Sequence, residues 1–114
     1  MFLERRQFQR VFYGEPVRYK LIDSREEAYF QGALGRDVSE SGIRFVTDRF
    51  VPLNSRLMME MCFPPSLKPV KVVARPAWIR EIIRQEQFEI GNCFVEISEE
   101  DRCRIRNFVT STPG

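Results

Sequence analysis

Short β-forming segments, separated by turn residues, follow one another along the chain as far as Ile97 and dictate its fold class. Leu57, Met59, Met61 and Phe63 recur at every second position, a period of two that places them on the core face of one strand. We predict strands over residues 15–22, 28–38, 42–47, 56–63, 70–83 and 88–97. A chain of 114 residues with 43% apolar content forms one domain with a single core. The expected fold is all-β, a six- to seven-stranded antiparallel β-barrel, because closing the sheet removes exposed edges.

Three positions interrupt the expected strands. Gly32 and Gly35 predict a β-bulge or a close backbone approach in the second strand. Pro76 makes its segment either an edge strand or a long strand that bends there. The alternation changes phase at Gly91, which predicts a bulge at that residue. Trp78 lies inside a strand-like stretch, and we assign it to the core or the barrel wall in preference to a base-stacking surface.

One helix is expected, at the C-terminus of the chain. Ser98 is a good N-cap, and Asp101 adds a capping-box partner and a negative charge in the first turn. Ile105, Phe108 and Val109 follow at helical spacing and form a narrow apolar stripe. We therefore divide the single domain into an N-terminal arm over residues 1–12, a barrel over residues 13–97 and a helix over residues 98–110.

The composition argues against catalysis and metal chemistry. The chain has no histidine, which is the commonest general base and metal ligand. Cys62, Cys93 and Cys103 are odd in number and lack C-x-x-C spacing, so reduced thiols are expected. Neither a secretory signal nor a membrane span is visible, and we expect a cytoplasmic protein that is no enzyme and uses no cofactor.

Two clusters of polar residues carry the functional signal. Arg5, Arg6 and Arg10 form an R-R-x-x-x-R run, although the net charge of the chain is only +2. Guanidinium groups bind phosphates and the O6/N7 edge of guanine through paired hydrogen bonds. Asp37, Ser39 and Gly42 form a D-x-S-x-x-G segment between two predicted strands. A carboxylate and a hydroxyl there complement the donors of the same ligand, so the pair of clusters indicates a guanine-nucleotide site.

The order and spacing of these clusters resemble the PilZ domain, a bacterial receptor module for cyclic di-GMP. Arg6 and Arg10 match its R-x-x-x-R element, and Asp37, Ser39 and Gly42 match its [D/N]-x-S-x-x-G element. Residues 90–94, with sequence I-G-N-C-F, resemble its late G-x-x-F strand. The resemblance covers nearly the whole chain and implies a PilZ-type barrel. It also implies that the arginine arm wraps over the ligand, with Arg6 and Arg10 on guanine edges and phosphates.

Each candidate residue also has a purely structural interpretation. Asp37 and Ser39 are ordinary turn formers that accept hydrogen bonds from nearby backbone N–H groups. Gly42 acts either through a positive φ or by allowing a ligand to approach closely. Arg44 and Arg75 are expected to face solvent. The arginine run by itself is typical of a solvated terminus, and the alternative role of Arg5 is only to add positive field near the site.

Phe8 and Phe12, which flank the run, are expected to anchor the N-terminal segment on the barrel or to meet a partner.

The resulting hypothesis is a receptor that binds cyclic di-GMP, orders its arginine arm and signals to an unidentified downstream protein. A PilZ-like adaptor that acts only through protein contacts is the alternative. A barrel that binds single-stranded nucleic acid ranks lower, because such barrels combine a basic groove with several exposed aromatic residues. An enzyme ranks last, and a homodimer is left open.

Overall fold

The computed structural model describes residues 8–22 and 29–113. Within them, seven strands precede one helix, in the order β1 (Val11–Phe12), β2 (Pro16–Leu21), β3 (Gln31–Ser39), β4 (Gly42–Thr47), β5 (Leu57–Met61), β6 (Val70–Ile82), β7 (Gln87–Ile97) and α1 (Glu99–Ser111). The predicted strands all occur in the described part of the chain, with ends that shift by a few residues.

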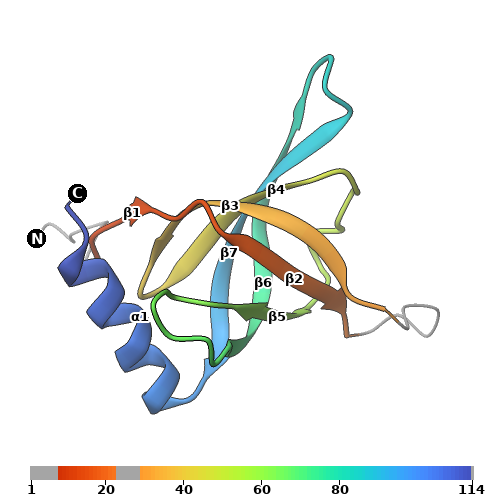
Figure 1. Cartoon of the computed structure of the whole chain (residues 1–114). Helices are drawn as coiled ribbons and strands as arrows, with labels where there is room; N and C mark the ends of the chain where they lie inside the picture. The colour runs from red at the N-terminus through yellow and green to blue at the C-terminus, as the bar shows by residue number, and fades with distance from the viewer. Residues whose placement is uncertain (1–7, 23–28, 114) are drawn as a thin grey trace, which may run out of the picture.

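The strands form one antiparallel sheet that closes on itself (Figure 1). Around the barrel the order is β3, β2, β5, β6, β7 and β4, and β4 pairs back onto β3 to complete six strands. β2 pairs with the first part of β3, from Gln31 to Leu34. The short strand β1 adds to Asp37 and Val38 farther along. The segment that enters β1 therefore runs beside the end of β3 that carries the D-x-S-x-x-G residues.

The barrel encloses a continuous apolar core. Leu57, Met59, Met61 and Phe63 are all buried, which confirms the alternation seen in the sequence. Tyr19 stacks on Phe45 with ring centroids 5.2 Å apart. The other core residues come from the remaining strands, from connecting segments and from the helix, namely Val11, Tyr13, Val17, Val38, Ile43, Val51, Val70, Val72, Ala74, Ile90, Ile105 and Val109.

Tyr13 anchors the N-terminal segment. Its ring is 1% exposed, and its hydroxyl donates a hydrogen bond of 2.6 Å to the carbonyl of Cys62. It also contacts Phe63 and, edge-on, Phe108 of α1. Burial raises the pKa of the Tyr13 phenol well above its ordinary value, because the charged form would lose its hydration. With Tyr13 fixed, the preceding residues are held against the outside of β3.

The C-terminal helix lies beside one end of the barrel (Figure 1). Ser98 is its N-cap and accepts a hydrogen bond from the Asp101 N–H, as predicted. The Asp101 carboxylate accepts instead from the Lys71 N–H and from Arg104, so the second half of the predicted capping box is absent. Ile105 and Val109 are buried and Phe108 packs against them. This helix, the one present in the described residues, lacks the length and apolar run needed to cross a membrane.

Two register shifts bend the β6–β7 pair, and one prediction about them is wrong. On β7 the extra residue is Val95, because Val73 pairs with Glu96 and Ala74 with Phe94. The second shift places the extra residue on β6, at Ala77, because Pro76 pairs with Asn92 and Trp78 with Gly91. The predicted bulge at Gly91 thus belongs to the partner strand, and Pro76 marks a bend in a long strand. Gly35 in β3 does border a register shift, as predicted.

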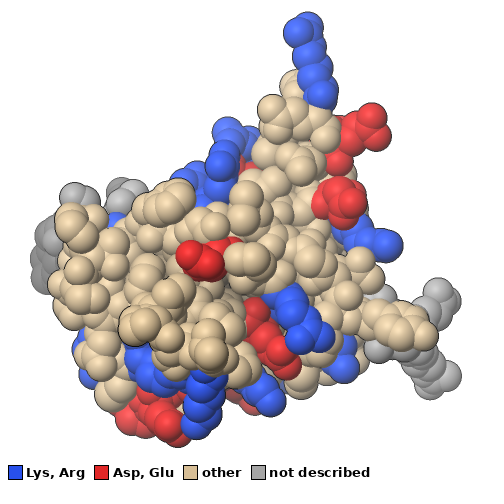
Figure 2. Space-filling view, viewed as in Figure 1, with Lys and Arg blue, Asp and Glu red and all other residues tan. Residues whose placement is uncertain are grey.

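Beyond the barrel, β6 and β7 continue as a hairpin that projects from the body of the molecule (Figure 1). Its turn contains Arg84 and Glu86, both with positive φ. Ile83 beside them is 77% exposed. Figure 2 shows basic atoms at the tip of this hairpin and a mixture of acidic and basic side chains over the rest of this face.

Candidate ligand-binding site

A row of four residues crosses the outside of the barrel through its four neighbouring strands β3, β4, β7 and β6. The register pairs Asp37 with Arg44, Arg44 with Gly91, and Gly91 with Trp78. Residues that face each other in adjacent strands have Cβ atoms about 5 Å apart, so their side chains can interact directly. The fold therefore brings a carboxylate and a guanidinium from the β3–β4 hairpin and an indole from the distant strand β6 onto one surface.

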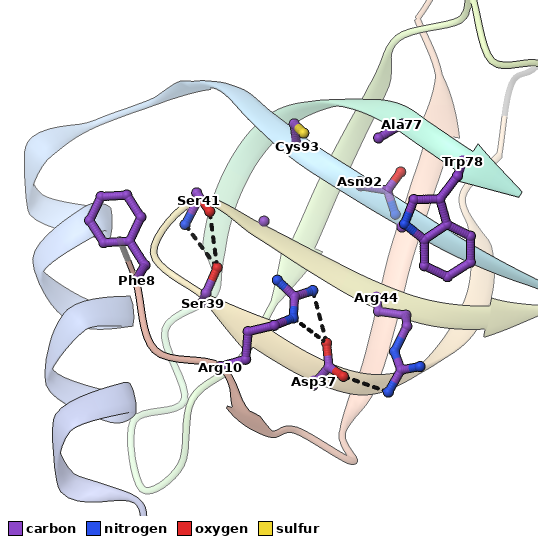
Figure 3. A pocket seen from close by; sticks show the side chains of 12 residues that line it. Phe8, Arg10, Asp37, Ser39, Ser41, Arg44, Ala77, Trp78, Asn92 and Cys93 are labelled. Atoms are coloured by element: carbon purple, nitrogen blue, oxygen red, sulfur yellow. Dashed lines mark hydrogen bonds and ion pairs between the residues drawn. The ribbon is translucent and has the colours of Figure 1, made fainter. Parts of the chain in front are cut away.

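This row forms the floor of a pocket of about 600 Å³. The lining residues come from the N-terminal segment and from the strands just named: Phe8, Arg10, Asp37, Ser39, Ser41, Gly42, Arg44, Ala77, Trp78, Gly91, Asn92 and Cys93. Figure 3 places Phe8 and Trp78 at opposite ends, with Arg10, Asp37 and Arg44 between them. Pockets of this size hold small organic ligands, and aromatic ends flanking charged groups fit a ligand with flat rings and a charged centre.

Asp37 joins the two sequence clusters. One of its oxygens, Oδ1, lies 2.9 Å from Nη2 of Arg10 and accepts a hydrogen bond from its Nε at 3.2 Å. The other oxygen, Oδ2, lies 2.5 Å from Nη2 of Arg44 (Figure 3). Both oxygens are thus engaged, one by a guanidinium of the N-terminal segment and the other by one of the barrel.

The chain of charges continues away from the pocket. Arg44 reaches Glu89 through its second Nη atom at 3.0 Å, and Arg80 makes an ion pair with the same carboxylate. Glu89 is only 3% exposed, which is unusual for a carboxylate and is tolerated because two guanidinium groups compensate it. Cations and anions therefore alternate from the N-terminal segment to the β6–β7 hairpin in the order Arg10, Asp37, Arg44, Glu89 and Arg80.

The turn after Asp37 is built by Ser39. Its buried hydroxyl accepts a hydrogen bond from the Ser41 N–H at 3.2 Å and lies 3.1 Å from the Ser41 hydroxyl. This is the turn-forming role considered for Ser39, whereas Asp37 lies within β3 and takes no part in the turn. Glu40, between Ser39 and Ser41, accepts a hydrogen bond of 3.1 Å at Oε1 from Nε of Arg106 on α1. This hydrogen bond raises the pKa of the Arg106 guanidinium. The turn is thus fixed to the helix.

Two glycines let the strands of the site pack closely. A Cβ atom on Gly42 would lie 2.1 Å from the carbonyl oxygen of Asn92 on β7. Among the described residues no glycine has a positive φ, so of the two roles considered for Gly42 the left-handed conformation does not apply. A Cβ atom on Gly91 would lie 2.2 Å from Nε1 of Trp78, which shows that the indole lies directly over β7 at that point.

The structure corrects two assignments made from the sequence. Trp78 is 42% exposed and lines the pocket, so it is not part of the core. Arg44 pairs with two carboxylates in the pocket wall and does not face solvent freely. The expectation for Arg75 is correct, since it is exposed. The bulge at Ala77 explains the error for Trp78, because one extra residue moves the following side chains to the other face.

The N-terminal residues divide into three groups. Arg10 and Phe8 line the pocket, whereas the Phe12 side chain is 73% exposed and its ring lies over Gly14. Arg5 and Arg6 lie outside the described residues. The site members placed by the structure, Arg10, Asp37, Ser39 and Gly42, all meet at one pocket.

The pocket supplies donors and acceptors for hydrogen bonds. Arginine, carboxylate, hydroxyl and backbone groups surround it, and Cys93 at its edge is a free thiol, like Cys62 and Cys103. Within residues 8–22 and 29–113 no three histidine, cysteine or acidic side chains gather as a metal site would require. The groups that line the pocket fit an anionic ligand that also offers hydrogen-bond donors.

Fold and pocket together define a small closed β-barrel with a polar binding surface on its outer wall. The family model described as "PilZ domain" matches residues 4–111. The chain belongs to the PilZ domain family, a family of receptor and adaptor domains. A search of curated proteins finds no significant match.

Solved PilZ structures share the fold at low sequence identity. The inhibitor of motility MotI from Bacillus subtilis is 18% identical with a TM-score of 0.76, and the match covers 96% of this chain and 51% of that one. The chain thus spans about half the length of MotI. The PilZ domain of YcgR from Escherichia coli, solved with cyclic di-GMP, is 14% identical with a TM-score of 0.65, covering 96% and 92% of the two chains. PlzA from Borreliella burgdorferi, also in complex with cyclic di-GMP, is 13% identical with a TM-score of 0.64, covering 93% and 41%.

Proposed function

We propose that this domain is a cyclic di-GMP receptor whose ligand occupies the pocket between Phe8 and Trp78. The observation that carries the proposal is the ion pair of 2.9 Å between Arg10 and Asp37, since it joins the two clusters at one pocket. Related PilZ structures that contain cyclic di-GMP support the choice of ligand.

In this proposal each pocket residue meets a complementary part of the ligand. Arg10, with Arg6 and Arg5 before it, binds phosphate or the O6/N7 edge of guanine. Asp37 accepts hydrogen bonds from the N1–H and N2–H₂ groups of guanine. The Ser39 hydroxyl and the backbone at Gly42 complete the polar contacts. A base can also stack on Trp78, because its indole is half exposed at the pocket.

The signal arises when the ligand changes the position of the arm. Binding transfers the Arg10 guanidinium from Asp37 to the ligand and orders the arginine arm that precedes β1 around it. Charge-assisted hydrogen bonds offset the entropy lost by the arm. Because the domain binds without catalysing a reaction, the ordered arm then presents a changed surface to a downstream protein.

The adaptor alternative also has an observation in its favour. Both oxygens of Asp37 have arginine partners within the chain, so the protein alone can compensate the charge of this carboxylate. An adaptor of this kind would use the same network only to hold its fold. Direct measurement of ligand binding decides between the two.

Titration calorimetry with cyclic di-GMP provides the test. Arg10→Ala and Asp37→Ala should each raise Kd by roughly 10- to 150-fold, since a hydrogen bond to a charged group is worth about 1.5–3 kcal/mol. Arg36→Ala is the matched control for Arg10, because Arg36 is exposed on the same strand as Asp37 and does not line the pocket. Asp48→Ala is the control for Asp37, because Asp48 is an exposed carboxylate that does not line the pocket. Equal heats in wild type and in both pocket variants would refute the site, and no heat in wild type would refute the receptor.

A further inference from the structure

Glu89 is a buried carboxylate that the proposed contacts do not use. It lies on β7, two residues before Gly91, and is 3% exposed. Its register partners are Val46 on β4 and Arg80 on β6, so it sits one row away from the pocket floor. A carboxylate this deeply buried is costly unless it is paired. Here it accepts from Arg44 at 3.0 Å and from Arg80.

Arg44 is held from both ends by this arrangement. One Nη atom donates to Glu89 at 3.0 Å and the other donates to Asp37 at 2.5 Å. Its Nε is buried without a hydrogen-bond partner. Two carboxylates on separate strands therefore fix the guanidinium between them, and each carboxylate receives only one of the two Nη atoms. Because Glu89 accepts from one Nη atom, Arg44 donates to Asp37 through the other Nη atom alone.

We propose that Glu89 is a positioning residue for the ligand pocket, which keeps Arg44 shared between two carboxylates. Arg44 then occupies only Oδ2 of Asp37, and Oδ1 becomes available to ligand donors when Arg10 moves to the ligand. If Glu89 loses its charge, Arg44 can turn both Nη atoms towards Asp37 and form the bidentate pair that guanidinium and carboxylate favour. Asp37 would then be withdrawn from the ligand. The inference rests on the proposed function, because it concerns affinity for cyclic di-GMP at that site.

The substitution Glu89→Gln separates positioning from simple electrostatics, because the two predict opposite signs. Removing a negative charge near the pocket should strengthen binding of a doubly anionic ligand if only the field matters. Loss of the Arg44 anchor should instead raise Kd about tenfold. Glu81→Gln is the matched control, since Glu81 is an exposed carboxylate on the same hairpin and the charge change is identical. It should leave Kd unchanged or slightly lowered.

A double-mutant cycle identifies Arg44 as the intermediary. Arg44→Lys keeps the charge but replaces the fork with one ammonium group, which cannot hold both carboxylates in the same way. If Glu89 acts through Arg44, the double variant binds about as well as Arg44→Lys alone. Additive losses overturn the inference. Arg80→Gln should have little effect, because Arg80 has a side chain that is 70% exposed, and a loss equal to that of Glu89→Gln also overturns it.

Folding and ligand identity are controlled separately. Circular dichroism and thermal unfolding establish that each variant is folded at the titration temperature. If Glu89→Gln unfolds, Glu89→Asp takes its place, because its side chain is shorter by one methylene and should also lose the contact with Arg44 and raise Kd, and an unchanged Kd would overturn the inference. Solvent exchange of the Arg44 Nε–H by NMR tests the anchor without ligand. It should be slow in wild type and faster in Glu89→Gln, and equal exchange rates overturn the inference. Absence of cyclic di-GMP binding in wild type would overturn the receptor proposal, and the exchange rates would still judge the anchor.

Discussion

Gly42 on β4 leaves no room for a side chain against the backbone of β7, and its replacement tests how tightly the site is packed. A Cβ atom there would meet the Asn92 carbonyl oxygen at 2.1 Å, whereas Cβ atoms essentially never come within 3.0 Å of another heavy atom. The neighbour is backbone, so relief requires β4 and β7 to separate by about 1 Å. Overpacking of this kind costs about 1–3 kcal/mol. For a domain of this size, that corresponds to a fall in Tm of roughly 4–12 °C.

The assay is urea and thermal unfolding of Gly42→Ala beside Gly32→Ala. Gly32 lies on β3 with nothing within 4 Å of its would-be Cβ, so its replacement should be neutral or stabilising by up to about 1 kcal/mol. The Gly42 variant should also bind cyclic di-GMP more weakly, because the shift displaces the motif turn from Asp37. Equal stability of the two variants would refute the packing explanation and leave Gly42 a role in ligand contact alone.

Three further outcomes follow from single contacts. Ser98→Ala should destabilise the domain by about 1 kcal/mol in urea unfolding, because it removes the side-chain cap of α1. Tyr13→Phe should cost about 1 kcal/mol near pH 8 by losing the bond to Cys62. The phenol pKa is raised in the folded state, so the protonated Tyr13 contributes its full stability below the unfolded pKa of about 10 and loses it as pH rises further. Between pH 8 and pH 11 the wild type should therefore lose more free energy of unfolding than Tyr13→Phe, which has no phenol to ionise. Trp78 is the sole tryptophan, so Gly91→Ala, which forces the indole off β7, should shift the fluorescence maximum, and an unchanged spectrum would contradict the geometry.

Features fixed by local pattern could be predicted from the sequence. The Leu57–Phe63 alternation requires only a period of two, and β4 was predicted with its observed bounds, Gly42–Thr47. The cap at Ser98 depends on residues three apart in the chain. Membership of the PilZ family followed from two motifs, and the family match over residues 4–111 confirms it. Each of these signals lies within one segment of chain or in the order of segments.

Features that depend on cross-strand register could not be predicted. The side chain of Trp78 faces the pocket because Ala77 is an extra residue, and nothing in the segment itself shows which residue bulges. For the same reason the β7 bulge was predicted at Gly91, whereas the extra residue is Val95. Arg44 looked like a solvent-facing strand residue because its partners, Asp37 and Glu89, are 7 and 45 residues away. The ion pairs of Arg44 with these two carboxylates depend on the pairing of β4 with β3 and β7, which the sequence of one segment does not reveal.

The alternation of charges around the pocket limits what can bind there. A bare phosphate would attract Arg10 but would be repelled by Asp37, whose carboxylate is within 2.9 Å of that arginine. A ligand therefore gains most if it offers acceptors to Arg10 and donors to Asp37 together, so that neither charge is left unpaired when their mutual contact is broken. Guanine joined to phosphate has both edges. The phosphodiester backbone of single-stranded DNA supplies acceptors but no donors, so a strand held through its backbone alone would leave Oδ1 of the Asp37 carboxylate unpaired once Arg10 moves away.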